Sequence, residues 1–436
     1  MILRPSATLL SLLTRSALLA LSSGMLSNEA RAETYLVNPQ GTGDFPNLET
    51  ALAQVVDGDV IELADGEYVG FGSIFDFHGK AITVRSQSGS PRDCRISYSS
   101  YGFQDAGFTF QSGEGPGSLL QGVMITAGFS GTPGPRARGT CTGGVGVSVL
   151  NGSSPTLLNL LLEENPVGVL ACDSSPQLQD CEFNSNGIGV LIVGKSAPFA
   201  VASSTFDRNT TGIACEGSLG TVTGCLVTRS GGYASTTPIG TGIAFRLGSS
   251  AEVDSCWIQG NNRGVMITES DPTLTNCLIT GNGDASPAVF VGSNSNATVR
   301  RSTIASNYAY DNDAGGLIVL SSTVQVEQSI IWGNCSYGGG DIHAGSGSTI
   351  TMTCSLADSN SVSGNVQWLG TNVFEDPYFT EPRNCYDYPT TEGNYCPSEF
   401  SPAWKVPGCG NLGAVIANCS VSVTSTSWGQ IKALYR

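Results

Sequence analysis

A short pattern of residues recurs eight times between Pro155 and Asn334, and seven of the copies end at an asparagine. The copy from Leu274 to Asn282 shows it clearly: an apolar residue, two others, a small residue, one other, an apolar residue, two others, then the asparagine. The eight anchor positions are Asn165, Asn186, Asn209, Ser230, Asn261, Asn282, Asn307 and Asn334, spaced by 21, 23, 21, 31, 21, 25 and 27 residues. A repeat this short, with variable insertions, indicates a solenoid.

Two columns of the repeat are apolar in every copy, and we expect both to point into a shared interior. Eight residues before the anchors stand Leu157, Leu178, Val201, Val222, Val253, Leu274, Val299 and Val326. Three residues before them stand Leu162, Phe183, Phe206, Val227, Ile258, Ile279, Ile304 and Ile331. The positions between are mixed, as alternation along a half-buried strand requires. Gly and Ser interrupt every run that could otherwise be a helix.

A second strand is predicted just beyond each anchor. Its apolar residues are Val169, Val190, Ile213, Ile243, Val265, Val289, Leu317 and Ile342. One repeat should therefore form one coil of two or three short strands, and stacked coils should form parallel sheets. We expect the anchor asparagine to occupy a turn in the left-handed conformation, and the stacked side-chain amides to hydrogen-bond along the ladder.

These repeats resemble the right-handed parallel β-helix of the pectin-lyase-like superfamily, and especially a bacterial group of secreted β-helix repeat proteins. The resemblance covers about residues 34 to 415. It implies an all-β solenoid with an N-terminal capping helix, here Leu48 to Val56 capped by Asn47, and an irregular C-terminal cap. It implies no particular activity, because the fold carries lyases, hydrolases, esterases, adhesins and tailspikes.

Four segments are expected along the chain. Residues 1–32 read as a signal peptide with an Ala30-Arg31-Ala32 cleavage site, residues 33–359 as the β-helix, 360–419 as the C-terminal cap and 420–436 as a short tail. No later run is long enough for a transmembrane helix. We therefore expect an exported, monomeric protein, located outside the cell, on its surface or in the periplasm.

Fourteen cysteines fit an oxidising compartment, and they lack the C-x-x-C spacing of a zinc framework. Cys181, Cys225, Cys256 and Cys277 stand in a third column, five residues before the anchor, where small buried residues are expected. Cys256 and Cys277 are placed to bridge adjacent coils, and Cys385, Cys396, Cys409 and Cys419 lie in the irregular cap. The sequence leaves the pairing open.

The formal net charge of −16 argues against a nucleic-acid partner, which would require a basic surface. It permits divalent cations. The two histidines, His78 and His343, belong to distant coils, and the chain has neither the Gly-His-Gly and Asp-Asp motifs of polygalacturonases nor the paired Asp motifs of pectin methylesterases. The absence of these motifs favours a scaffold without catalysis.

One concentration of carboxylates stands out at positions predicted to face outward: Glu163, Asp180, Glu182 and Asp207. Polysaccharide lyases that share this fold use an arginine as base and carboxylates that hold calcium, so the resemblance implies a candidate calcium site here, with Arg208 adjacent in sequence. The alternative is a solvated acidic face, which an acidic protein must have somewhere.

Two tryptophans, Trp257 and Trp332, are also predicted to face outward, three coils apart. Because sugar rings stack on exposed aromatic side chains, these are the candidate carbohydrate-binding residues. We therefore expect a secreted scaffold that binds a polysaccharide or cell-surface glycan, or acts in adhesion, without catalysis. The alternative is a polysaccharide lyase or glycoside hydrolase that acts on an acidic polysaccharide.

Overall fold

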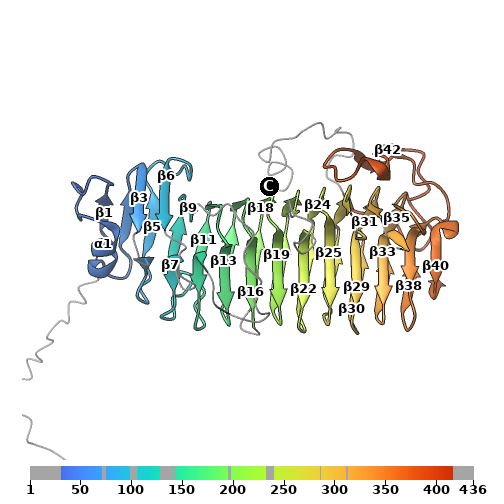
Figure 1. Cartoon of the computed structure of the whole chain (residues 1–436), viewed down its shortest axis with the longest axis horizontal. Coiled ribbons are helices and arrows are strands. Elements are labelled where there is room, and N and C mark those ends of the chain that lie inside the picture. The colour runs from blue at the N-terminus through green and yellow to red at the C-terminus, as the bar shows by residue number, and fades with distance from the viewer. Residues whose placement is uncertain are drawn as a thin grey trace, which may run out of the picture. The chain divides into compact units, whose positions relative to one another are not determined.

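The computed structural model describes residues 31–70, 75–98, 106–127, 141, 144–194, 198–231, 240–284, 286–310 and 313–415. The predicted signal peptide up to residue 30, the loop at 131–139, most of the insertion at 231–241 and the tail at 420–436 lie outside these ranges. Within them the chain coils repeatedly through three parallel sheets, which we call A, B and C (Figure 1).

Sheet A contains fourteen described strands. They are β1 (Thr34–Val37), β2 (Val60–Leu63), β5 (Thr83–Ser86), β8 (Leu119–Gln121), β11 (Thr156–Leu158), β14 (Gln177–Gln179), β17 (Phe199–Ala202), β20 (Leu219–Thr223), β23 (Ser250–Asp254), β26 (Thr273–Thr275), β30 (Asn296–Arg300), β34 (Thr323–Glu327), β38 (Thr349–Thr353) and β41 (Val366–Leu369). Every neighbouring pair that is recorded in this sheet is parallel, as a solenoid requires.

Sheet B contains twelve described strands. They are β3 (Gly66–Gly70), β6 (Cys94–Tyr98), β9 (Met124–Thr126), β12 (Leu161–Glu163), β15 (Glu182–Asn184), β18 (Thr205–Asp207), β21 (Leu226–Thr228), β24 (Trp257–Gln259), β27 (Leu278–Thr280), β31 (Thr303–Ala305), β35 (Ile330–Trp332) and β39 (Leu356–Ala357). Most of these strands are only three residues long, because the small-residue turn before them and the anchor turn after them are close in sequence.

Sheet C also contains twelve described strands. They are β4 (Phe75–Asp76), β7 (Ala106–Phe110), β10 (Val145–Val149), β13 (Val167–Cys172), β16 (Ile188–Val193), β19 (Thr211–Glu216), β22 (Thr241–Arg246), β25 (Arg263–Thr268), β29 (Val289–Gly292), β33 (Ala314–Leu320), β37 (Gly340–Ala344) and β40 (Val362–Gly364). A small parallel sheet, β28 (Gly283–Asp284), β32 (Tyr308–Ala309) and β36 (Cys335–Ser336), lies between sheets B and C in the later coils.

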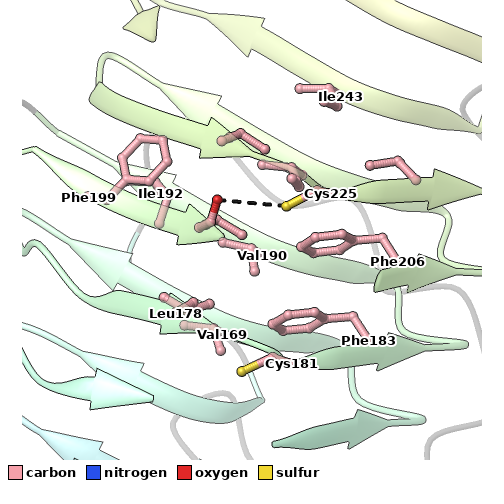
Figure 2. Close-up of a cluster of buried hydrophobic side chains, with 14 of the residues drawn as sticks. Val169, Leu178, Cys181, Phe183, Val190, Ile192, Phe199, Phe206, Cys225 and Ile243 are labelled. Carbon is pink, nitrogen blue, oxygen red and sulfur yellow. Dashed lines mark hydrogen bonds between the residues drawn. The ribbon is translucent and has the colours of Figure 1, made fainter. Parts of the chain in front are cut away.

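The three predicted apolar columns are confirmed as in-register rows of the core. Leu157 pairs with Leu178 in sheet A, Leu162 with Phe183 in sheet B, and every member of both columns is at most 1% exposed. The third column, including Ile342, lines the interior from sheet C. Like side chains therefore stack on like, as in the parallel rings of Phe183 and Phe206, whose centroids are 4.6 Å apart (Figure 2).

The asparagine ladder is also confirmed. Each amide nitrogen donates to the side-chain oxygen of the next anchor, at 2.7 to 3.0 Å, in the pairs Asn165–Asn186, Asn186–Asn209, Asn261–Asn282, Asn282–Asn307 and Asn307–Asn334. The backbone N–H of each donor residue bonds to the same oxygen. The ladder does not stop at Asn334, because the side-chain Oδ1 of Asp341 accepts both of its bonds.

The expected left-handed conformation of the anchors is wrong by one residue. Positive φ angles occur just before the anchor, at Glu164, Ser185, Arg208, Arg229, Gly260, Gly281, Ser306 and Gly333. The anchor itself must direct its amide along the stack, and the sharp bend falls on its predecessor. Glycine is common there because it adopts this conformation without strain.

The N-terminal helix α1 (Leu48–Gln54) begins where predicted, with the side chain of Asn47 accepting a hydrogen bond from Thr50 N. It ends at Gln54 because Val55 is extended. Leu48, Leu52 and Val55 are buried in the main core. The helix thereby covers apolar surface beside the first coils (Figure 1).

The coils continue past the boundary expected at residue 359, since β40 and β41 still pair with sheets C and A around the short 3-10 helix Ser359–Ser361. The remaining described residues, 370–415, are called the cap segment here. It contains an antiparallel pair, β42 (Phe379–Glu381) and β43 (Asn394–Pro397), and a 3-10 helix, Cys385–Asp387. An irregular C-terminal part was expected, but it begins after β41 and not after residue 359.

Disulfides join Cys141 to Cys172, Cys335 to Cys385, and Cys354 to Cys409, and Cys396 is disulfide-bonded as well. The last two of the three named bridges tie the cap segment to the coils. The four cysteines of the small-residue column are buried, and Cys256 and Cys277 do not bridge. Burial raises the pKa of Cys277 to about 12, which keeps it a thiol.

Candidate functional site

The cap segment begins at the end of the stack, where Val373 bridges Leu356 of β39, and then turns back along the outer face of sheet B. Its backbone N–H groups donate to the coils at successive positions: Gly413 to Gln328 O at 2.8 Å, Ala414 to Thr303 Oγ1 at 3.0 Å and Val415 to Asn276 Oδ1 at 2.5 Å. Figure 1 shows β42 beside the strands of the later coils. One side of the solenoid is therefore covered by a non-repeating layer.

Two glycines, at the turn from sheet B to sheet C, lie against the cap segment. Thr390 N donates to Gly281 O at 2.9 Å, and a Cβ on Gly281 would collide with Thr390 O. A Cβ on Gly260 would approach Thr391 Cγ2 to 3.0 Å. In the two preceding coils the same corner position is occupied by Arg208 and Arg229. Glycine at this corner marks where the cap segment docks.

Gly281→Ala is expected to loosen the cap segment. The matched control is Gly224→Ala, because Gly224 has the same φ of +61° but no atom within 4 Å of the position that a Cβ would take. The control therefore introduces only backbone strain, which costs about 1 kcal/mol. Limited proteolysis should cut residues 370–415 roughly fivefold faster in Gly281→Ala than in Gly224→Ala. Equal cleavage rates would show that docking at this corner contributes nothing to holding the segment.

Where docking ends, a hollow of about 420 Å³ opens between the corner and the cap segment, here named the arginine hollow. It is lined by Arg208, Arg229, Gly231, Gly260, Asn262, Pro389, Thr390, Thr391 and Glu392. Asp207 holds both arginines: Arg229 donates to its two oxygens at 2.6 and 2.7 Å, and Arg208 Nη1 lies 3.2 Å from Oδ2. Asp207 offsets one of these two cations, and the other charged residue of the lining, Glu392, is itself paired with Arg383.

A second hollow of about 430 Å³ lies farther along the same face, here named the Trp332 pocket. Its lining is Ser306, Trp332, Gly333, Cys335, Asp376, Tyr378, Phe379, Pro382, Arg383, Asn384 and Cys385. Trp332 comes from strand β35, whereas Tyr378 and Phe379 come from the cap segment. The pocket thus combines aromatic side chains with a carboxylate, a guanidinium and an amide, as small-molecule sites commonly do.

The four predicted calcium ligands do not form a metal site. The described part of the chain contains no group of three or more His, Cys, Asp or Glu side chains placed to hold a metal ion. Glu163 and Asp207 share a row of sheet B two coils apart, but Asn184 lies between them and donates to Glu163 at 2.9 Å. Asp180 sits at the preceding corner with φ 57°, and Glu182 pairs with Arg92 at 3.1 Å.

The two tryptophans have different surroundings. Both point out of the coil interior, as predicted, but Trp257 is only 7% exposed because Tyr395 of the cap segment packs over it. Trp257 is therefore not available to stack on a sugar, and that prediction is wrong. Trp332 is half-buried and lines the pocket named after it.

The residues that sequence reasoning missed are those of the cap segment, above all Asp376, Tyr378 and Arg383. No periodicity extends into this segment, so nothing in the sequence indicated which coil it would reach. The two histidines remain apart: His78 lies 3.7 Å from Asp76 in an early coil, and His343 contacts Ser363 at 2.8 Å near the end of the stack.

Comparison with known proteins supports the architecture. The family model for the right-handed β-helix region matches residues 203–331 and 232–365. Among solved structures, pectate lyase Pel9A is 17% identical with a TM-score of 0.41, over 88% of this chain and 96% of that one. The chain is a right-handed parallel β-helix repeat protein.

Two further solved structures are similar to this chain at low identity. The catalytic unit of a GH87 α-1,3-glucanase from Streptomyces thermodiastaticus strain HF3-3 is 13% identical, with a TM-score of 0.45 over 75% of this chain and 66% of that one. Tailspike protein 3 of bacteriophage CBA120 is 12% identical, with a TM-score of 0.44 over 75% and 58%. Such likenesses concern the fold alone. A search of curated proteins finds no significant match.

Proposed function

We propose that this protein is an exported β-helix scaffold that binds a polysaccharide without cleaving it, with the Trp332 pocket as its sugar-binding site. The observation that carries the proposal is the composition of that pocket. Trp332, Tyr378 and Phe379 offer apolar ring faces to the C–H face of a sugar, while Asp376, Arg383 and Asn384 offer partners for its hydroxyl groups.

The absence of a matched pair of catalytic groups in the pocket supports binding over hydrolysis. Glycoside hydrolases place two carboxyl groups on either side of the bond that breaks. Among the residues that line the pocket, Asp376 is the one carboxylate, and it accepts a hydrogen bond from Tyr378 N at 2.7 Å. Arg383 pairs with Glu392 at 2.5 Å, so its charge is already matched.

Export is supported by the signal-like N-terminus and by the disulfides, which persist in oxidising compartments. Within the described ranges no helix has both the length and the apolar composition to cross a bilayer.

One observation favours a second candidate, a lyase that acts on an acidic polysaccharide. The arginine hollow has two guanidinium groups that face a space large enough for a sugar unit. Arg208 and Arg229 both form ion pairs with Asp207, however, and a guanidinium held by a carboxylate is a poor base. This hollow suits the binding of a uronate better than removal of its proton.

The test uses the mature chain and a panel of neutral and uronate polysaccharides, with retention measured by affinity electrophoresis. New reducing ends and unsaturated products are assayed in parallel. We expect retention on at least one glycan without either product. Accumulation of unsaturated product would establish the lyase instead, and the absence of retention on every glycan would contradict the proposal.

Tyr378→Ala is expected to weaken that retention about tenfold, because a stacked aromatic ring is lost from the pocket. Tyrosine and alanine both carry a Cβ, so the left-handed backbone of residue 378 is equally strained in the wild type and in the variant. The matched control is Phe400→Ala, which removes an aromatic ring that is 81% exposed on the cap segment but outside the pocket. Equal retention of the two variants would exclude Tyr378 from the site.

A further inference from the structure

Two short tyrosine motifs from distant parts of the sequence meet on one surface. Tyr308 and Ala309 form strand β32 of the small sheet and Tyr310 follows it directly, whereas Tyr386-Asp387-Tyr388 belongs to the cap segment. Alternation along β32 places Tyr308 and Tyr310 on the same face. Tyr388 stacks on Tyr308 with ring centroids 4.3 Å apart, and Tyr386 lies 5.4 Å from the same ring.

A fifth tyrosine extends this group to the next coil. β32 pairs in parallel with β36, so that Ala309 faces Ser336 and Tyr310 comes opposite Tyr337. The rings of Tyr310 and Tyr337 are 6.3 Å apart and inclined by 32°. Tyr310 is 54% exposed, Tyr337 84% and Tyr386 65%. Tyr308 is the buried centre, and the other tyrosines present aromatic surface to solvent.

The position of these rings is fixed by the fold. The disulfide Cys335–Cys385 joins β36 to the residue just before Tyr386, and Tyr310 N donates to Asp284 O of β28 at 2.8 Å. Rings that are already ordered lose little conformational entropy when a ligand binds. Tyr310 and Tyr337 expose neighbouring rings, and Tyr386 is exposed beside Tyr308, unlike the scattered aromatics of an ordinary surface.

The charges around the rings indicate the class of ligand. Asp284 pairs with Ala309 from one coil earlier, and Asp387, which accepts from Asn384 N at 3.3 Å, separates Tyr386 from Tyr388. Asp313, which lies 3.4 Å from His343, follows Tyr310 in sequence. All three are exposed. Carboxylates accept hydrogen bonds from hydroxyl groups but repel uronates and sulfates, and the chain as a whole carries a net charge of −16.

We propose that Tyr310, Tyr337 and Tyr386 form a binding platform for a neutral polysaccharide, whose sugar rings stack on the tyrosines while their hydroxyl groups donate to the surrounding aspartates. The platform rests on the proposed function and gives it a ligand class. It adjoins the Trp332 pocket, since Cys335 and Cys385 line that pocket as well. One glycan chain can therefore contact both across the disulfide.

The experiment compares the mature chain with the double variant Tyr310→Ala/Tyr337→Ala by affinity electrophoresis in soluble starch, dextran, galactomannan, mixed-linkage β-glucan and polygalacturonate. We expect retention on a neutral glycan, and about tenfold weaker retention of the double variant. Tyr337→Phe keeps the ring and should keep the affinity. Phe400→Ala is the control for loss of an exposed aromatic ring elsewhere, and circular dichroism verifies that each variant is folded.

The outcomes separate this proposal from the previous one. If the wild type is retained and the double variant is retained equally, the platform is overturned while glycan binding stands, and Tyr378→Ala then tests the pocket alone. If the wild type is retained by polygalacturonate alone, the neutral ligand class is wrong. If no polysaccharide retains the wild type, the proposed function fails and the platform fails with it.

Discussion

Asn282→Ala is expected to lower the free energy of unfolding by about 3 kcal/mol or more. The side-chain oxygen of Asn282 accepts from the N and Nδ2 of Asn261, both at 3.0 Å, and its Nδ2 donates to Ile258 O at 2.8 Å and Asn307 Oδ1 at 3.0 Å. The side chains of Asn261, Asn282 and Asn307 are all buried. Alanine would leave the N–H of Asn261 without its acceptor in a site that excludes water, and the cost of such a group is its full desolvation.

The chain offers a matched control in the same column. Ser230 occupies an anchor position, is fully buried, and its hydroxyl has no hydrogen-bond partner, while its backbone N–H donates to Asn261 at 2.9 Å. Ser230→Ala should therefore change the stability by less than about 1 kcal/mol. Midpoints of guanidinium unfolding measure both variants, and unfolding rates provide a second readout. Similar losses in the two variants would show that the ladder adds no more than packing.

Asp341→Asn is expected to stabilise the protein at pH 8, by up to about 4 kcal/mol, and to have little effect near pH 4. Asp341 is 2% exposed, and burial raises its pKa from 3.8 to about 7, although the two hydrogen bonds from Asn334 oppose the rise. The folded chain therefore keeps this proton up to about pH 7, whereas the unfolded chain releases it near pH 4. Between these values the folded state binds more protons, so stability falls as the pH rises.

An asparagine at position 341 carries no charge at any pH, and its side-chain oxygen can still accept both bonds from Asn334. The difference in unfolding free energy between variant and wild type should grow from about pH 4 to about pH 7 and then level off. Asp284→Asn, at an exposed residue, is the control and should show no comparable growth. A constant difference across this range for Asp341→Asn would mean that the carboxyl group does not retain its proton on folding.

The coils were predictable from sequence because each is a local unit that is repeated in register. Equivalent positions in different coils have the same environment, as Val201, Phe206 and Asn209 do in one coil and Leu274, Ile279 and Asn282 in another. Each position of the coil is therefore sampled eight times in the sequence. The same redundancy located the small-residue turns and the inward-facing side chains of sheet B. It misplaced the left-handed residue because the repeat gives the position of a turn but not the torsion angle of each residue within it.

The candidate site was much less predictable, because it depends on contacts that occur once. Trp257 faces outward from its coil, and it is buried by packing with Tyr395 of the cap segment, which is far away in the sequence. The tyrosine motifs at 308–310 and 386–388 were visible as alternating residues, but nothing in the sequence indicated that a disulfide between Cys335 and Cys385 brings them together. Asp341 lies only seven residues beyond Asn334, yet it is an acid where the column predicts an amide.

The ladder of anchors has one direction throughout. In every recorded pair of anchors the earlier coil donates and the later coil accepts, and Asn334 donates to Asp341 of the strand that follows it. During synthesis from the N-terminus, the newest coil therefore always has donors whose acceptor has yet to emerge, and each added coil satisfies the one before it. The series ends at Asp341, whose Oδ1 accepts both bonds from Asn334, although the coils themselves continue through β41.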